Sequence, residues 1–171
     1  MKILFLDIDG VLNSEVSFNE THEKWFASGE STKGTEYNWP LGHLYPPYIL
    51  LLNKIVEATD CKIVISSSWR IICHVHNLQE WLTIKGFKHS DHIIDSTGRN
   101  NDGRRGGEIQ DWLDANQHII KSYVVIDDDA EDIIGDKTTK KHPNNFVKTS
   151  FKTGLTQECV DKAIAILNSK D

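Results

Sequence analysis

The chain has 171 residues and a formal net charge of −6, with 39% hydrophobic and 26% charged residues. These values favour one folded domain over residues 1–171, and they disfavour a disordered chain or a protein that coats nucleic acid through general positive charge. No apolar stretch approaches the roughly 18 residues of a membrane helix, and no signal-peptide pattern opens the sequence, so we expect a cytoplasmic protein that does not enter a membrane.

The first predicted strand covers residues 3–6, a short apolar run that ends at Asp7, Ile8, Asp9 and Gly10. Side-chain direction repeats every two residues in an extended backbone, so Asp7 and Asp9 are expected to point the same way. Gly10 allows a sharp turn that brings backbone amides close to whatever the two acids hold. Two carboxylates at the carboxyl end of a buried strand predict a functional site there.

Residues 14–45 form a polar insert after this strand, with a short helix predicted around residues 20–27. Its aromatic residues are Phe18, Trp25, Phe26, Tyr37 and Trp39. A segment of this length in a compact domain usually has a function, and its aromatic content disfavours disorder. Two interpretations stay open. The rings pack on the flank of the domain, or the insert is a small lid or substrate platform over the Asp7 and Asp9 end.

The rest of the chain alternates between helical and strand patterns. Helices are predicted over residues 46–60, around 78–86, over 108–120 and around 160–167. Strands are predicted over residues 61–65, 92–94, 123–126 and 146–149. This alternation favours an α/β fold, a three-layer Rossmann-like parallel sheet with helices on both faces. Ligands of such sheets bind at the carboxyl ends of the strands.

Polar side chains follow several of the predicted strands, and the carboxyl edge of a parallel sheet would gather them. The candidates are Asp7 and Asp9, the serines Ser66, Ser67 and Ser68, either Arg104 or Arg105, and Asp127 with Asp128. Crowded carboxylates repel one another unless a cation joins them, and oxygen ligands suit Mg²⁺. Serine hydroxyls and an arginine guanidinium are good donors for phosphate oxygens. The combination predicts metal-assisted phosphoryl chemistry.

Residues 7–11, with the sequence DIDGV, resemble the first motif of the haloacid dehalogenase (HAD) superfamily of phosphatases and phosphotransferases, Asp-x-Asp-Gly-[Thr/Val]. The resemblance implies that Asp7 is the catalytic nucleophile, which forms an aspartyl-phosphate. It implies that Asp9 is the general acid and then the general base. It also implies a Mg²⁺ cofactor, with a backbone carbonyl of Ile8 or Asp9 completing the metal shell.

Two later motifs of the superfamily fall at the ends of other predicted strands. The hydroxyl of the second motif falls on Ser66 or Ser67. The acids of the fourth motif fall on Asp127 and Asp128, with Asp132 as a further acid of that loop. The metal ligands implied by the resemblance are Asp7, Asp9, Asp127 and Asp128.

The third motif is a basic residue, usually lysine, at the start of the helix before the last of these strands. No lysine occupies that place here. Arg105 lies 22 residues before Asp127 and fits the spacing, and Arg104 is the alternative. The resemblance implies that this arginine clamps the phosphate.

Two sequence details, SSSWR at 66–70 and RGGEIQDWL at 105–113, resemble compact HAD domains found in RNA-repair contexts, which are related to polynucleotide phosphatases. A large cap domain has no room in this chain, so an open site for a phosphate on a bulky substrate is implied. Arg70 and Arg104 are the expected substrate-binding residues. Arg99 and the aromatic insert are expected to join Arg70 in contacting the substrate by salt bridging and stacking, and a nucleotide or nucleic-acid phosphate end is the expected partner. The alternatives are a small-metabolite phosphatase, a phosphotransferase, and a non-catalytic phosphate-binding domain.

Three further groups of residues receive structural interpretations. The cysteines, which have no metal-type spacing, are expected to be reduced thiols in or beside the core: Cys61, Cys73 and Cys159. His74 and His76 are expected at the surface or at a helix start rather than on a metal. The basic run Lys137, Lys140 and Lys141 is expected to be a solvated loop.

Overall fold

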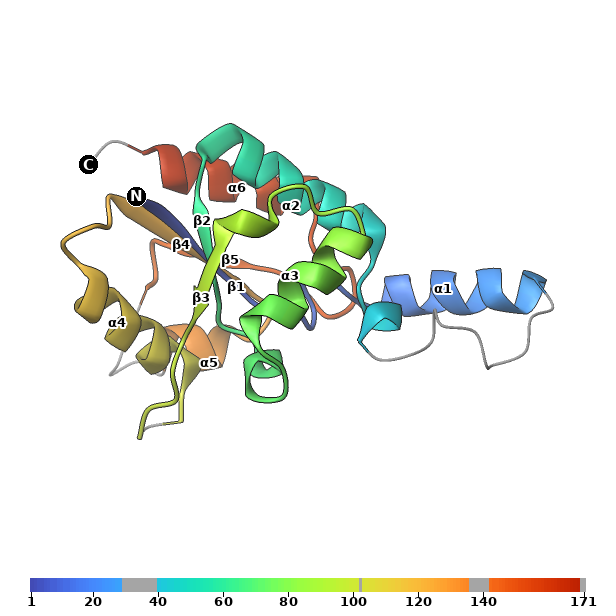
Figure 1. Ribbon diagram of the computed structural model, residues 1–171, viewed down its shortest axis with the longest axis horizontal. Coiled ribbons are helices and arrows are strands. Elements are labelled where there is room, and N and C mark those ends of the chain that lie inside the picture. Colours follow the sequence, from blue (N-terminus) through green and yellow to red (C-terminus); the bar gives the residue numbers. More distant parts are fainter. Residues whose placement is uncertain (29–39, 102, 136–141, 170–171) are drawn as a thin grey trace.

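The computed structural model describes residues 1–28, 40–101, 103–135 and 142–169. Its centre is a sheet of five parallel strands in the order β3-β2-β1-β4-β5 (Figure 1). The strands are β1 (Lys2–Leu6), β2 (Lys62–Ile65), β3 (Ile93–Ser96), β4 (Ser122–Asp127) and β5 (Phe146–Lys148). Because β1 lies between β2 and β4, the polar residues that follow these three strands meet at one edge of the sheet.

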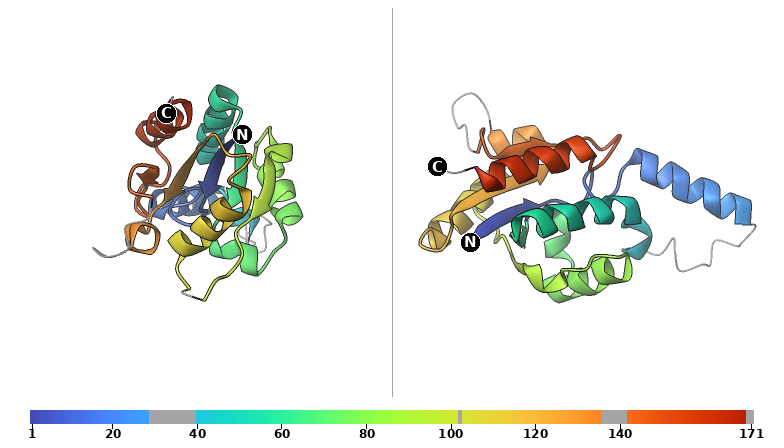
Figure 2. Two further views of the ribbon diagram at one scale, coloured as in Figure 1. Left: turned by 90° about the vertical axis from the view of Figure 1, so that its left-hand side faces the viewer. Right: turned by 90° about the horizontal axis from the view of Figure 1, so that it is seen from above.

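Helices cover both faces of the sheet, as Figure 2 shows. One face carries α2 (Pro46–Thr59), α3 (Val75–Ile84) and α6 (Gln157–Asn168), whose apolar residues form the main core with Leu4 and Leu6. The other face carries α4 (Arg105–Asn116) and α5 (Ala130–Ile134), which cover Ile3 and Phe5. The alternation along β1 follows the two-residue period of a strand, and all four side chains are fully buried. These two cores confirm the predicted three-layer α/β fold.

The insert after β1 begins as a helix that extends away from the sheet. This helix is α1 (Glu15–Ser28), which projects from the body of the molecule in Figure 1 and in the right view of Figure 2. Its start is tied to the body of the molecule, because the Glu15 amide donates to the Phe151 carbonyl at 2.8 Å and the Ser14 hydroxyl lies 2.7 Å from that of Tyr48. Phe18 contacts the His43 ring, with 5.2 Å between ring centroids.

The helix in the insert is therefore longer than the predicted 20–27 segment. Phe18, one of the five aromatic residues of the prediction, packs on the flank of the domain through His43 and Phe151. Tyr37 and Trp39 lie outside the described residues. A lid or platform function of the insert stays a prediction.

Several other predicted boundaries differ from the structure by a few residues, and the differences at α4 and α5 have clear physical reasons. Helix α4 begins at Arg105 rather than at Glu108, because its first turn contains Gly106 and Gly107, which are poor helix formers and hide the periodic pattern. Helix α5 was not predicted from the sequence, since it is only five residues long. It begins where the Asp129 carboxylate accepts hydrogen bonds from two backbone amides of the helix.

The remaining structural interpretations hold for the described residues. Cys61 and Cys159 are buried, Cys73 is half-buried, and none of the three forms a disulfide. His74 is the N-cap of α3, and exposed His76 lies 3.2 Å from Glu80 on the same helix. The run Lys137, Lys140 and Lys141 lies outside the described residues. Within the described chain, every helix is too short or too polar to cross a membrane.

Candidate active site

Asp7 lies at the centre of the candidate site, directly after β1. Its backbone amide donates to the Ile126 carbonyl at 3.1 Å, which continues the pairing of β1 with β4. Phe5, two residues earlier, faces the α4 side of the sheet, and the Asp7 side chain meets the first residue of α4. Burial raises the pKa of Asp7 above its ordinary value, while Arg105 and Ser67 act in the opposite direction. A buried carboxylate with a perturbed pKa is a candidate catalytic group.

Arg105 is the first residue of α4, and it joins the ends of two strands. Its Nη1 donates to Asp7 Oδ2 at 2.7 Å and to Asp127 Oδ2 at 2.5 Å. Its backbone amide donates to Asp132 Oδ1 at 3.1 Å. Burial lowers the pKa of the guanidinium, but Asp7, Asp127 and Asp132 together raise it by more, so Arg105 stays charged. Of the two arginines considered from the sequence, Arg105 reaches the acids, while Arg104 is the exposed residue that precedes α4.

Three acids lie together beside Arg105. One carboxylate oxygen each of Asp7, Asp127 and Asp128 lies within 4.8 Å of the others. Asp127 is fully buried, and burial followed by the charge of Asp7 raises its pKa to about 7. Burial and Asp7 also raise the pKa of Asp128. Three carboxylates beside one guanidinium leave an excess of negative charge, which a divalent cation with oxygen ligands would neutralise. The donor set therefore fits Mg²⁺.

Gly10 makes room for Asp128 in this group. Its backbone is left-handed, with φ +71°, and a Cβ atom at this position would lie 2.4 Å from Asp128 Oδ2. Any other residue would be strained and would displace the Asp128 carboxylate. The Gly10 amide also donates to Asn13 Oδ1 at 3.0 Å, which holds the turn after β1. The residue after Asp9 is therefore a glycine because Asp128, which follows β4, lies directly against it.

Asp9 has different partners from Asp7. Its Oδ1 accepts from Asn13 Nδ2 at 2.8 Å, and its Oδ2 accepts from Trp69 Nε1 at 3.0 Å. The prediction that Asp7 and Asp9 point the same way assumed an extended backbone, but β1 ends at Leu6 and a turn begins at Asp9. The group of three acids found among the described residues does not include Asp9. A metal-binding role for Asp9 stays a prediction.

The two serines after β2 differ in their surroundings. The Ser67 side chain lies close enough to Asp7 to lower the pKa of that carboxyl. The Ser67 hydroxyl also accepts from the Trp69 amide at 3.4 Å. The Ser66 hydroxyl is buried and has no hydrogen-bond partner among the described residues. Of the two serines considered from the sequence, Ser67 is the one that the structure brings to Asp7.

Arg70 is buried beside the site and is tied to the protein through all three of its guanidinium nitrogens. Nη1 donates to the carbonyls of Ser66 and Ser67, with 2.7 Å to the latter, and Nε donates to the Thr97 carbonyl at 3.0 Å. Nη2 donates to Glu108 in α4, and both of these side chains are more than nine-tenths buried. Arg70 therefore joins the ends of β2 and β3 to α4. A contact between Arg70 and the substrate stays a prediction.

Sequence reasoning missed two residues that support the site. Trp69 donates to Asp9 across 60 residues of sequence, and no local pattern indicates such a contact. Gly106 allows close packing of α4 on α5, because a Cβ atom there would lie 2.2 Å from the Ile133 carbonyl oxygen. The pair of glycines at the start of a helix was the available signal for this contact. The packing places Arg105 beside Asp132.

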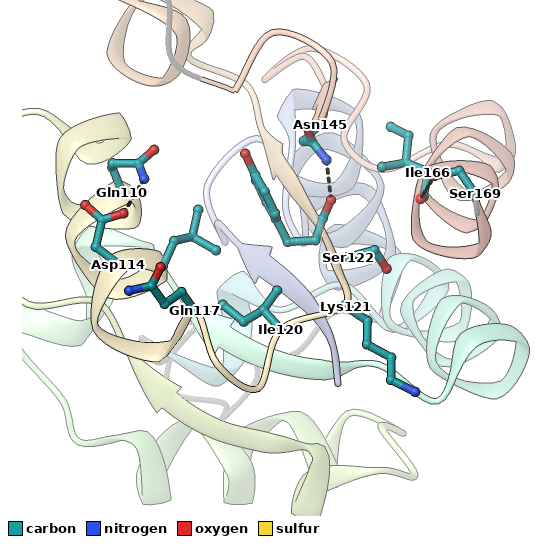
Figure 3. A pocket seen from close by; sticks show the side chains of 11 residues that line it. Gln110, Asp114, Gln117, Ile120, Lys121, Ser122, Asn145, Ile166 and Ser169 are labelled. Carbon is teal, nitrogen blue, oxygen red and sulfur yellow. Dashed lines mark hydrogen bonds between the residues drawn. The ribbon is translucent and has the colours of Figure 1, made fainter. Parts of the chain in front are cut away.

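A cavity at the opposite edge of the sheet, away from Asp7, has different chemistry. It has a volume of about 420 Å³ and lies beside the amino end of β4, next to α4 and α6 (Figure 3). Its polar side chains bond mainly to the protein: Asn145 Nδ2 donates to the Tyr123 carbonyl at 2.9 Å, and Gln110 donates to Asp114 at 2.7 Å. Ligands of open α/β sheets bind at the carboxyl ends of the strands, so we place the active site at the Asp7 edge.

A Rossmann-like parallel sheet whose central strand is followed directly by DIDG, with acids at the end of the neighbouring β4, is typical of an HAD-type domain. The sequence comparison agrees with this class. Residues 3–160 match the family model of the HAD domain in Swiss Army Knife RNA repair proteins, and the chain belongs to this family. No curated protein and no solved structure matches the chain.

Proposed function

We propose that the protein is a Mg²⁺-dependent phosphatase that acts through an aspartyl-phosphate on Asp7. One observation carries the proposal: the buried Asp7 carboxylate lies within 4.8 Å of Asp127 and Asp128 and is held by Arg105 at 2.7 Å. Family membership supports a phosphatase-type activity. The RNA-repair context of the family favours a phosphorylated nucleotide or nucleic-acid end as the substrate.

In the first step, an Asp7 oxygen attacks the phosphorus of the substrate. The bond between phosphorus and the leaving oxygen breaks, and Asp9 gives its proton to that oxygen. In the second step, Asp9 takes a proton from water and the water oxygen attacks the phosphorus. The bond between phosphorus and the Asp7 oxygen breaks, which frees the Asp7 carboxylate and inorganic phosphate. Asn13 and Trp69 hold the Asp9 carboxylate in place for both proton transfers.

Arg105 and Ser67 would bind the phosphoryl oxygens during these steps. Both are donors that contact Asp7 in the structure, so a phosphoryl group on Asp7 would lie within their reach. Asp7, Asp127 and Asp128 would hold Mg²⁺, and a backbone carbonyl of Ile8 or Asp9 would be a further predicted ligand. The bound ion would offset the repulsion between these carboxylates and the phosphate.

Two rival functions keep the same fold. A non-catalytic domain that binds a phosphorylated partner would have no use for an acid and base at Asp9, which is anchored by two donors here. A phosphotransferase or a small-metabolite phosphatase would use the same groups and differ only in the acceptor or the substrate.

The proposal is tested by Mg²⁺-dependent release of phosphate from an aryl phosphate. The wild-type protein, Asp7→Asn and Asp9→Asn are compared, with Asp161→Asn on the exposed face of α6 as a matched control for the lost charge. We expect both site variants to lose more than about 100-fold in kcat and the control to keep full activity. Full turnover by Asp7→Asn would reject the proposed nucleophile. No turnover of any phosphate by wild type would favour the binding domain.

A screen of substrates then separates the enzymatic rivals. It compares mononucleotides, oligonucleotides with a 3′- or 5′-phosphate, and phosphorylated small metabolites, all with Mg²⁺. We expect the oligonucleotide ends to be hydrolysed with the highest kcat/KM. Exclusive turnover of a small metabolite would contradict the nucleic-acid assignment.

A further inference from the structure

A cavity of about 290 Å³ lies next to the cluster of Asp7, Asp127 and Asp128, because Arg105, which bonds two of these acids, also lines the cavity. It lies between the turn after β2, the loop after β3 and the start of α4. Three arginines line it, namely Arg70, Arg99 and Arg105. The proposed reaction uses Arg105 but has no function for the other two.

Among the described residues, the acids around this cavity leave one arginine without an ion-pair partner. Of the two acids that line it, Glu108 bonds Arg70, and Asp132 bonds the backbone of Arg105 and lies 3.8 Å from its Nε. Arg99 is exposed and forms no ion pair among the described residues. The pKa of Arg70 is lowered: burial has the largest effect, and the charges of Arg105 and Arg99 act in the same direction, while the charges of Glu108 and Asp7 raise it. Guanidinium groups that repel one another around a cavity are stabilised by an anion placed between them.

Arg105 lines the cavity and also bonds two of the three clustered acids, Asp7 and Asp127. Its Nη1 bonds Asp7, while its Nε side faces Asp132 in the cavity wall. A substrate with one phosphoryl group at Asp7 can therefore present a second anionic group on the other side of the same guanidinium. Ile71, which is 50% exposed, forms an apolar part of the cavity wall, and Ser68 also lines the cavity. An apolar wall beside arginines suits a nucleoside with its phosphate better than a lone inorganic anion.

We propose that this cavity binds the second phosphate of a nucleotide substrate whose terminal phosphate lies at Asp7. The substrate class is then a nucleic-acid end, or a nucleoside bisphosphate as its smallest form, rather than an isolated phosphomonoester. The proposal rests on the proposed phosphatase function for the position of the first phosphate. Arg99 supplies the positive charge for the second phosphate. It is therefore the residue that would make the protein prefer a substrate with two phosphates over an isolated phosphomonoester.

The kinetic test measures kcat/KM for adenosine 3′,5′-bisphosphate, the two adenosine monophosphates and an aryl phosphate. The proteins are wild type, Arg99→Ala, Arg99→Lys and Lys121→Ala, the last being an exposed cation at the opposite edge of the sheet. Wild type should prefer the bisphosphate over the better monophosphate by at least about tenfold. Arg99→Ala should bring this ratio close to one, Arg99→Lys should restore part of it, and Lys121→Ala should keep it. An equal ratio in wild type and Arg99→Ala would overturn the proposal.

A binding experiment separates this proposal from the phosphatase proposal. Calorimetry measures the Kd of adenosine 3′,5′-bisphosphate for the Asp7→Asn protein, with and without Arg99→Ala. A Kd that rises at least about tenfold with Arg99→Ala supports the subsite even if no phosphate is hydrolysed by wild type. An unchanged Kd overturns the subsite even if the phosphatase is active. An equal preference for a sugar bisphosphate, lost in Arg99→Ala, would overturn the nucleotide class.

Discussion

The substitution Asp127→Asn is expected to stabilise the metal-free protein at neutral and alkaline pH, although it alters a candidate metal ligand. Burial, followed by the charge of Asp7, raises the pKa of Asp127 from 3.8 to about 7. Between these pH values the folded protein holds a proton that the unfolded chain has released. The contribution of the protonated Asp127 to the free energy of unfolding is therefore fully present below about pH 4 and is lost as the pH rises through about 7. Asparagine keeps the shape of the side chain but does not ionise.

The size of the effect follows from the pKa. A change from 3.8 to about 7 corresponds to roughly 4 kcal/mol in the free energy of unfolding, because one pKa unit is about 1.4 kcal/mol. This value is a ceiling, since water and small side-chain movements relieve part of the cost of a buried charge. Half of it, about 2 kcal/mol, would raise the midpoint of thermal unfolding by roughly 4–8 °C in a chain of this size.

The assay is thermal unfolding followed by circular dichroism between pH 4 and pH 8, with EDTA or with Mg²⁺. In EDTA, the advantage of Asp127→Asn over wild type should be near zero at pH 4 and should grow up to pH 8. Mg²⁺ should stabilise wild type strongly and Asp127→Asn much less, because one ligand is lost. Asp161→Asn should follow wild type throughout, since Asp161 is exposed. A less stable Asp127→Asn protein in EDTA at pH 8 would refute the reasoning about the buried charges.

Two further predictions concern residues that hold the site together. Glu108→Ala leaves Arg70 with an uncompensated buried charge, so the free energy of unfolding should fall by about 3–5 kcal/mol. Urea denaturation measures this change. A loss below about 1 kcal/mol would show that the ion pair contributes little to stability. Trp69→Phe removes the donor to Asp9 at 3.0 Å but keeps an aromatic ring, so kcat on an aryl phosphate should fall about tenfold with little change in KM. Trp112→Phe removes a comparable indole bond to a carboxylate in a different part of the protein and should keep kcat; equal effects of the two changes would show that Trp69 acts only through packing.

Most of the fold could be predicted from the sequence because β1, β2 and β4 are short apolar runs that end abruptly in polar residues. Such a pattern marks both the buried strand and the edge at which the site lies. The strand order could not be predicted in the same way, because it depends on contacts between segments far apart in the chain. Helix α5 was missed because five residues carry too little periodicity, and the start of α4 was missed because its first turn contains two glycines.

The candidate site was predicted as a set of residues, but the choices within pairs needed the structure. Whether Ser66 or Ser67 meets Asp7 depends on the residue at which β2 ends, and a difference of one residue reverses the direction of the side chain. Whether Arg104 or Arg105 reaches the acids depends equally on where α4 begins. The anchoring of Asp9 depends on a contact between distant segments, which a periodic pattern cannot indicate.

The central claim is that Asp7 itself carries the phosphoryl group during turnover. The most direct measurement mixes the protein with a phosphorylated substrate and Mg²⁺, stops the reaction with acid within a single turnover, and locates the added phosphoryl group in the digested protein by mass spectrometry. We expect the group on the amino-terminal peptide at Asp7, its disappearance in later samples as phosphate is released, and no label in Asp7→Asn. Turnover with an unlabelled protein, or a label on another residue, would contradict the account.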